Sequence, residues 1–121
     1  TPGFGLTVTL PAVVGSQRAA EILYTGRRFD GAEAFAFGLC DHLVAADQVD
    51  DEARRLAEAV AASAPLAVAS IRRTLRGALV AGVGDVLAEE RREQDRLMAT
   101  EDFREGLRAA KHRRAPAFRG V

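Results

Sequence analysis

The chain is short of the residues that hold a fold together covalently or through metals. Its 121 residues include one cysteine, one methionine and no tryptophan, and aromatic residues make up 6% of the composition. A single cysteine, Cys40, excludes an internal disulfide and leaves too few thiolates for a zinc or iron–sulfur site. We therefore expect neither a disulfide nor a metal, and we expect packing alone to stabilise the fold.

Excess charge and long apolar runs are absent too. Seventeen basic residues balance 17 acidic ones, so the net charge does not mark a nucleic-acid-binding protein. No stretch approaches the roughly 18 apolar residues of a membrane span, and the start lacks the basic flank and apolar run of a signal peptide. We expect no membrane span and a cytoplasmic address. The first residue is Thr1, which fits either removal of an initiator methionine or cleavage from a longer chain.

Apolar residues are plentiful, at 48% of the composition, and their spacing is typical of helices. Prolines and glycines in the first eleven residues predict a loop and at most two turns of helix. Ser16 is predicted to cap a second short helix. Asp30 is predicted to cap a third, with Glu33 completing a capping-box spacing and Gly38 ending it. Residues 39–44 alternate loosely and predict a short extended piece.

From residue 46 onward the pattern changes to long amphipathic helices. Apolar residues at helical spacing predict a helix over residues 49–61 and a second that begins at Pro65. Gly82 and Gly84 are expected to break that second helix, so that a third, highly charged one follows. Thr100 is predicted to cap a last helix. The residues expected on the buried side of that helix are Phe103, Leu107 and Ala110. A loop-rich first third followed by four helices is the expected organisation.

Catalytic side chains are hard to find in this sequence. The two histidines, His42 and His112, lie in no motif that brings an acid and a base together. Cys40 and His42 are two residues apart, which is not how a nucleophile and its base are presented. Gly3 and Gly5 resemble a fragment of a phosphate-binding loop that lacks its third glycine and its lysine. The patterns alone therefore predict no catalytic residue.

The last sixteen residues are asymmetric in charge. They contain five cations and no acid: Arg108, Lys111, Arg113, Arg114 and Arg119. One interpretation is a solvated terminal helix whose cations complement its dipole. Another is an anion site, suited to phosphate because the guanidinium fork matches phosphate oxygens. The residues alone leave both interpretations open.

Four segments, in order, resemble the enoyl-CoA hydratase/isomerase, or crotonase, family. They are Pro2-Gly3-Phe4-Gly5 with Leu10 to Gly15, then Ala19 to Phe29, Ala32 to Asp41, and Glu101 to Gly120. These are similar to the family's Pro-Gly-x-Gly loop, its "A-x-E-x-x-x-T-G-x-x-I/F" and "A-x-E/D-A-x-x-x-G-L-V" stretches, and its "D-x-x-E-G-x-x-A-F-x-x-K-R-x-P-x-F-x-G" ending. Because order and spacing agree over almost the whole chain, it is identified as a member, matched by the C-terminal part of the family.

The resemblance implies a mainly α fold, namely the C-terminal helical (trimerisation) part of the crotonase-type α/β spiral fold, with the N-terminal β-spiral half absent. Residues 1–45 would be the end of the core-domain segment, and residues 46–121 a C-terminal helical domain for oligomerisation and CoA capping. Expected partners are the missing N-terminal half and further copies in a trimer or hexamer. The helices that the resemblance assigns to packing and oligomer contacts carry Glu21, Glu33, Glu89 and Glu90.

The resemblance also implies site residues. The family's catalytic carboxylates would lie upstream of Thr1, so none is expected in this chain. The residues that would border the active site are Pro2, Gly3, Phe4 and Gly5. The residues expected to bind coenzyme A are Lys111, Arg113, Arg114 and Phe118. Arg113 stands where the family usually has a lysine that can pair with a phosphate of the nucleotide. Ala110 departs from the pattern, because an aromatic residue is common there.

The implied reaction is addition of water to a 2-trans-enoyl-CoA through an enolate, which two backbone N–H groups of the other half would stabilise. A coenzyme A thioester is the expected substrate, no prosthetic group is expected, and the chain alone is expected to be inactive. Isomerase, decarboxylase and hydrolase reactions of the same family stay open. The alternative of another class is a small helical module that binds nucleic acid or an acidic partner through its basic end. Missing aromatic interleaving disfavours nucleic acid.

Overall fold

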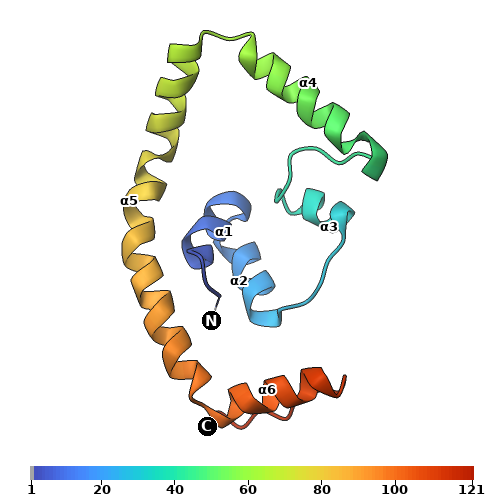
Figure 1. Ribbon diagram of the computed structural model, residues 1–121, viewed down its shortest axis with the longest axis vertical. Helices are drawn as coiled ribbons and strands as arrows, with labels where there is room; N and C mark the ends of the chain where they lie inside the picture. Colours follow the sequence, from blue (N-terminus) through green and yellow to red (C-terminus); the bar gives the residue numbers. More distant parts are fainter. Residues whose placement is uncertain (1) are drawn as a thin grey trace.

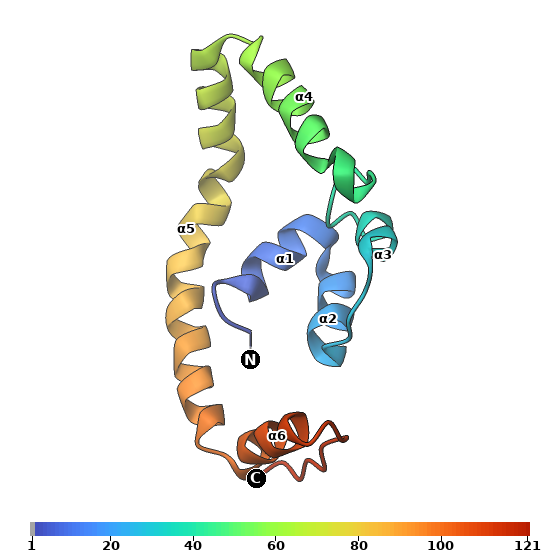
Figure 2. The same cartoon turned by 45° about the vertical axis from the view of Figure 1, so that its right-hand side comes forward.

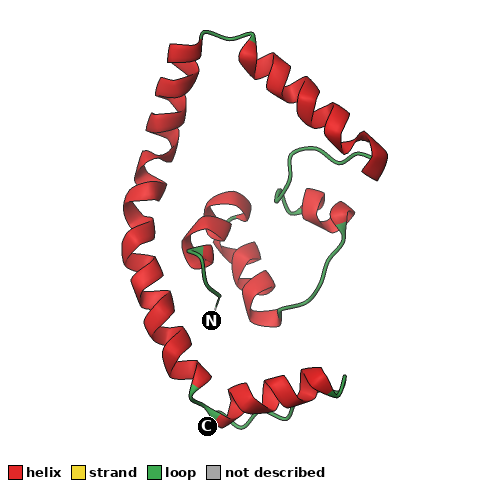
Figure 3. Cartoon of the chain, viewed as in Figure 1, coloured by secondary structure: helices red, strands yellow, loops and turns green. Residues whose placement is uncertain are grey.

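The chain is helical in the computed structural model, which describes residues 2–121 and forms no strand within them (Figure 3). The helices are α1 (Leu6–Val14), α2 (Ser16–Thr25), α3 (Gly31–Ala36), α4 (Val49–Ala61), α5 (Pro65–Met98) and α6 (Glu101–Lys111), and a 3₁₀ turn, η1 (Ala46–Gln48), precedes α4. The predicted mainly α fold is confirmed. The extended piece predicted over residues 39–44 is a loop, because the described chain offers no second strand to pair with it.

The helices form an open arc, with α5 along one side (Figures 1 and 2). α1 and α2 lie inside the arc, where α1 contacts both α2 and α5. α4 joins the far end of α5 through a short connection, and α6 turns back from the other end of α5, which it contacts. The contact between α1 and α5 therefore holds the start of the chain against its second half.

The longest helix, α5, runs without interruption through both glycines that the sequence predicts as a break. It spans 34 residues. Neither Gly82 nor Gly84 has a positive φ, and a methyl group at either would meet nothing within 4 Å. A glycine costs a helix about 1 kcal/mol, and no proline removes a backbone hydrogen bond here, so the flanking turns outweigh the cost. The predicted break is wrong, and residues 46–121, all of which are described, hold three α-helices rather than four.

Most helix ends agree with the sequence. Asp30 Oδ1 accepts a hydrogen bond from Glu33 N at 2.9 Å, and Thr100 Oγ1 accepts one from Phe103 N at 3.1 Å, so both predicted caps are confirmed. Gly38 ends its helix with a φ of 73°. Ser16 is instead the first residue of α2, because the residue before it is a glycine whose unusual backbone conformation starts the helix without a side-chain cap.

The described chain buries little of its apolar surface. Its accessible surface is 9555 Å², whereas about 6,300 Å² is typical of a folded monomer of this mass. Among the apolar residues of the described chain, Leu10, Ala19 and Ala109 are the buried ones. The prediction for α6 is wrong in register, since Leu107 is 58% exposed and Ala109 rather than Ala110 faces inward. The helices therefore present apolar faces that this chain does not itself cover.

Candidate functional site

The loop that the resemblance places beside the active site is seated on the middle of α5. Gly5 precedes α1 with a φ of 74°, and a methyl group at Gly5 would lie 3.4 Å from Val83 Cγ1. A methyl group at Gly3 would lie 2.7 Å from Gln94 Nε2. Phe4 projects outward and is 98% exposed. The positive φ of Gly5 is a conformation that favours glycine, whereas a side chain at Gly3 would have to displace the flexible end of Gln94.

A buried carboxylate on α5, that of Glu90, holds the start of α1. Its Oε2 accepts a hydrogen bond from Gly5 N at 2.8 Å. Its Oε1 accepts from Thr7 N at 3.0 Å and from Thr7 Oγ1 at 2.6 Å. A helix leaves its first N–H groups without internal partners, so this carboxylate satisfies donors at the positive end of the α1 dipole.

Burial and hydrogen bonding act on Glu90 in opposite directions. Burial, the largest single influence, favours the neutral carboxyl, since Glu90 is 4% exposed. The hydrogen bonds from the Thr7 hydroxyl and from the Thr7 and Gly5 N–H groups outweigh it, so the pKa of Glu90 lies below its usual value. Glu90 is therefore ionised at neutral pH.

The contact of Glu90 with the loop gives this residue a specific partner that the resemblance did not indicate. The position of Glu90 among the apolar residues of α5 is a signal that the sequence alone contains. Glu90 follows Val86 by four residues and Leu87 by three, and it precedes Leu97 by seven, so it lies within the apolar stripe of α5. A carboxylate in such a stripe needs hydrogen-bond donors from a neighbouring element.

The basic end of the chain folds back along α6, where Glu105 holds it. Arg114 donates from its two guanidinium nitrogens to the two Glu105 oxygens, at 2.6 and 3.0 Å, and Ala117 N donates to Glu105 Oε1 at 3.1 Å. The Arg114 guanidinium and then the Ala117 N–H lower the pKa of Glu105 to about 2. Arg114, one of the predicted coenzyme A residues, is thus engaged in an internal ion pair.

Asp102 holds the same segment nearer to its end. Asp102 accepts hydrogen bonds from Arg119 N and Gly120 N, both at 2.7 Å, and its own N–H donates to Val121 O at 3.1 Å. The Phe118 ring lies against the helix, so that a methyl group at Gly106 would be 3.7 Å from Phe118 Cε1. We call residues 113–121 the C-terminal strap.

The other two predicted coenzyme A residues lie where α6 ends. Lys111 and Arg113 are exposed, and neither forms an ion pair with another described residue. Arg113 has a φ of 51° and its N–H donates to Ala110 O at 3.2 Å, while Arg114 N donates to Ala109 O at 3.1 Å. This is the Schellman arrangement, in which glycine usually takes the place that Arg113 has here.

An apolar groove of about 500 Å³ lies beside the strap. Its lining is Leu97, Thr100, Asp102, Phe103, Gly106, Leu107 and Phe118. The groove places Phe118 of the strap on the same surface as the exposed apolar residues of α6. Cations and an apolar surface therefore meet at this end of the molecule.

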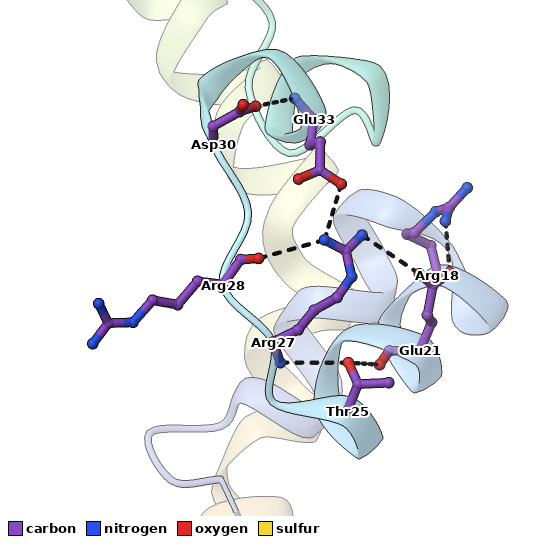
Figure 4. Close-up of polar contacts among 7 residues, drawn as sticks. All are labelled: Arg18, Glu21, Thr25, Arg27, Arg28, Asp30 and Glu33. Atoms are coloured by element: carbon purple, nitrogen blue, oxygen red, sulfur yellow. Dashed lines mark hydrogen bonds and ion pairs between the residues drawn. The ribbon is translucent and has the colours of Figure 1, made fainter. Parts of the chain in front are cut away.

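A separate cluster of charges joins α2 to α3 (Figure 4). Arg27 lies between two carboxylates, 2.9 Å from Glu33 Oε1 and 3.6 Å from Glu21 Oε1. Arg18 contacts Glu21 at 2.6 Å, and its guanidinium lies 4.4 Å from the centroid of the Phe37 ring. These charges satisfy one another, so the cluster acts as a link between helices.

The histidines and the cysteine do not come together as a reactive set. His42 Nδ1 lies 2.8 Å from Glu52 Oε1 of α4, and Cys40 is a half-buried free thiol. Within residues 2–121, no group of His, Cys, Asp and Glu side chains is arranged to hold a metal ion. The same part of the chain contains no helix long and apolar enough to span a membrane.

Comparison with known proteins gives one consistent family. Residues 1–121 match the family model for enoyl-CoA hydratase/isomerase. A Pyricularia oryzae protein named methylglutaconyl-CoA hydratase 1, mitochondrial, is 35% identical over 135 residues. A Homo sapiens protein named enoyl-CoA hydratase domain-containing protein 2, mitochondrial, is 33% identical over 123 residues. A crystal structure of enoyl-CoA hydratase/isomerase from Pseudoalteromonas atlantica T6c matches with a TM-score of 0.87 at 29% identity.

These matches cover nearly all of this chain and less than half of each relative. They take in 98% of this chain in all three cases, but 39%, 42% and 48% of the Pyricularia, human and Pseudoalteromonas chains. This coverage agrees with a helical C-terminal part. Two of the relatives are named as mitochondrial, so a cytoplasmic address stays a prediction. The chain, matched by the family model along its whole length, belongs to the enoyl-CoA hydratase/isomerase family.

Proposed function

We propose that residues 1–121 supply the C-terminal part of an enzyme that adds water to a 2-trans-enoyl-CoA. The observation that carries the proposal is the family match over the whole chain. Hydration is favoured over decarboxylation and hydrolysis because all three relatives described above carry hydratase in their names. It is favoured over isomerisation because the Pyricularia and human names give hydratase alone, whereas the Pseudoalteromonas name gives hydratase/isomerase. In this proposal the catalytic carboxylates and the N–H groups that stabilise the enolate belong to the other half of the enzyme.

The proposal includes assembly into a trimer or hexamer through α4 and α5. Its support is the apolar surface left uncovered on both helices. Val60, Ile71 and Leu75 are 49%, 63% and 74% exposed and line a common groove. An apolar surface of this kind is typical of a contact with other protein. The other half of the enzyme and neighbouring copies are the proposed occupants.

The proposal also places coenzyme A against the end of α6, where Lys111 and Arg113 are free to pair with phosphate. Support comes from the backbone of Arg113, whose φ of 51° is a conformation that costs a non-glycine residue about 1 kcal/mol. A residue kept in such a conformation is a candidate for a functional role. Phe118 and the apolar groove beside it offer a surface for the less polar parts of the ligand.

Hydration of crotonyl-CoA tests the reaction. The intact protein that carries residues 1–121, purified with any chain that accompanies them, should consume the enoyl thioester and form the 3-hydroxyacyl thioester. The isolated segment of residues 1–121 should not. Turnover by the isolated segment that a substitution within it removes would contradict the assignment of catalysis to the other half. Absence of turnover by the intact protein would contradict the hydratase assignment.

Substitution of Arg113 by glycine tests the coenzyme A site. Arg113→Gly should raise the free energy of unfolding by about 1 kcal/mol, because glycine adopts the left-handed conformation without strain. The same variant should bind coenzyme A more weakly, and it should bind 3′-dephospho-coenzyme A as the wild type does. Isothermal titration with both ligands measures the difference. An equal loss of affinity for both ligands would contradict contact with the 3′-phosphate. Arg104→Gly, on the exposed part of α6, is the control and should leave both affinities unchanged.

The alternative of a nucleic-acid-binding module finds less support in this geometry. Of the five cations near the chain end, Arg108 and Arg114 both face Glu105. Binding to mixed DNA and RNA that weakens steeply with salt would favour this alternative.

A further inference from the structure

We propose that Glu90 is a positioning residue that sets the geometry of the Pro2–Gly5 loop for the reaction. The inference rests on the proposed function, because that function makes the loop a border of the active site. Glu90 is not a catalytic residue in this proposal, since both of its oxygens already accept hydrogen bonds from Gly5 and Thr7. Its role is to hold main-chain atoms that the reacting atoms approach from the other side.

The first argument is the number of donors that converge on one side chain. Both oxygens of Glu90 are used, Oε2 by Gly5 N at 2.8 Å and Oε1 by Thr7 N at 3.0 Å and Thr7 Oγ1 at 2.6 Å. All three donors come from the segment that immediately follows Phe4. A carboxylate fixed by three bonds from neutral donors leaves that segment little freedom to rotate or slide.

The second argument is the fit of the loop onto α5 around the carboxylate. Three α5 residues share one face of that helix with Glu90: Val83, Leu87 and Gln94. A methyl group at Gly5 would lie 3.4 Å from Val83 Cγ1 and 3.8 Å from Leu87 Cδ2, and one at Gly3 would lie 2.7 Å from Gln94 Nε2. The loop therefore lies directly against this face of α5, within van der Waals reach of Val83 and Leu87, and Glu90 fixes its position along that surface.

The third argument is chemical, because the site requires a pure acceptor. An ionised carboxylate accepts at both oxygens, whereas an amide presents one oxygen and one NH₂ donor. In Glu90→Gln, the amide could still accept from Thr7, but its NH₂ would face the Gly5 N–H. Two donors in contact repel, and the Gly5 N–H would lose its partner in a buried place. The loop would shift, although the size and shape of the side chain are almost unchanged.

The experiment compares four variants of the intact protein in crotonyl-CoA hydration: Glu90→Gln, Thr7→Val, Thr7→Ser and Glu89→Gln. We expect Glu90→Gln to lower kcat about 10- to 100-fold, because a shift of the loop by about 1 Å would misplace groups at the reacting centre. KM should change less than about twofold. Thr7→Val, which keeps the side-chain shape and removes the hydroxyl donor, should lower kcat in the same sense. Thr7→Ser restores the hydroxyl and should retain wild-type kcat.

Glu89→Gln is the matched control. Glu89 is the chain neighbour of Glu90, but it is exposed and pairs with Arg92 on the surface of α5. Its substitution should leave kcat and KM unchanged. An equal loss of kcat in both glutamine variants would overturn the proposal, because it would show a general effect of charge on α5. Circular dichroism and elution volume verify that each variant is folded and assembled, and Thr7→Val carries the test if Glu90→Gln does not fold.

Amide hydrogen exchange separates this proposal from the proposed function. In Glu90→Gln, exchange at Gly5 should be at least about tenfold faster, which corresponds to loss of one buried hydrogen bond, and exchange in α2 should be unchanged. Unchanged exchange at Gly5, or wild-type kcat in Glu90→Gln, would overturn the positioning role. If the wild type does not hydrate crotonyl-CoA, the proposed reaction fails, and exchange alone then decides whether Glu90 holds the loop.

Discussion

Single carboxylates fix the two ends of this chain. Glu105 and Asp102 each accept hydrogen bonds from backbone N–H groups of the C-terminal strap, as Glu90 does from the start of α1. An exposed ion pair alone contributes little, because water competes for both charges. A carboxylate that also accepts from main-chain donors does more, because it orders the backbone itself. The position of the strap therefore depends on Asp102 and Glu105, the two carboxylates of α6 that accept hydrogen bonds from it.

We expect the strap to loosen as the pH falls through the titration of Glu105. The folded-state pKa of about 2 lies below the ordinary value of 4.5, so Glu105 stabilises the strapped form fully above about pH 4.5. That contribution is lost as the pH falls toward 2. The Ala117 amide resonance should follow this titration in an NMR experiment.

Two variants test whether the pH dependence of the Ala117 resonance comes from Glu105. Glu105→Gln should remove the pH dependence of the Ala117 resonance, whereas Glu101→Gln, on the exposed side of α6, should leave it in place. A wild-type midpoint near 4.5 at Ala117 would show that Arg114 does not hold Glu105 in solution.

At the scale of an element, α5 depends on its length and context more than on local propensity. Gly77, Gly82 and Gly84 all lie inside it, and its middle and last turns contact α1 and α6. Its first half, in contrast, is exposed on nearly all sides. Within residues 2–121, this part of the helix therefore depends mainly on its own backbone hydrogen bonds.

A peptide of residues 65–98 isolates that dependence. Gly82→Ala should raise its helix content, by an amount equivalent to about 1 kcal/mol, because alanine loses less backbone entropy than glycine. Ala81→Gly, at the adjacent position, should lower helix content by a similar amount. Circular dichroism in the far ultraviolet measures both. Equal helicity in the three peptides would mean that propensity has no role at this point of α5.

At the scale of the whole molecule, the accessible surface of the chain is larger than that of a typical folded monomer of the same mass. The accessible surface of 9555 Å² exceeds the value typical for a monomer of this size by about half. Ile71 and Leu75 are 63% and 74% exposed although their spacing of four residues is that of a buried helical stripe. Contacts within residues 2–121 therefore do not account for the apolar pattern of this sequence.

Leu75→Asp should reduce the mass of the assembled protein. A carboxylate at this position has water around it in the single chain, where Leu75 is 74% exposed, but it would be buried without a partner in an assembly that covers the groove. Light scattering coupled to size exclusion measures the mass. Ser70→Asp, which adds the same charge on another side of α5, should leave it unchanged, and an unchanged mass for Leu75→Asp would contradict assembly through this groove.

Much of the fold could be predicted from the sequence where the decisive atoms lie close together in the chain. The caps at Asp30 and Thr100 depend on residues three positions away, and the family motifs are contiguous. The hold of Glu90 on the loop joins residues 83 and 85 positions apart, so no local pattern contains it. The strap likewise depends on a reversal of the chain after α6. The break predicted at Gly82 is wrong because the low helix propensity of glycine is a weak local preference, whereas the continuity of α5 also depends on its flanking turns and tertiary contacts.

The wide separation of Glu90 from its donors also has a consequence during translation. Gly5 is synthesised 85 residues before Glu90, which at ribosomal rates of roughly 5–20 residues per second is an interval of about 4 to 17 s. Throughout that interval the start of α1 has neither its carboxylate nor the surface of α5 beneath it. The loop is therefore completed late, only after α2, α3 and α4 have been synthesised and α5 has reached Glu90.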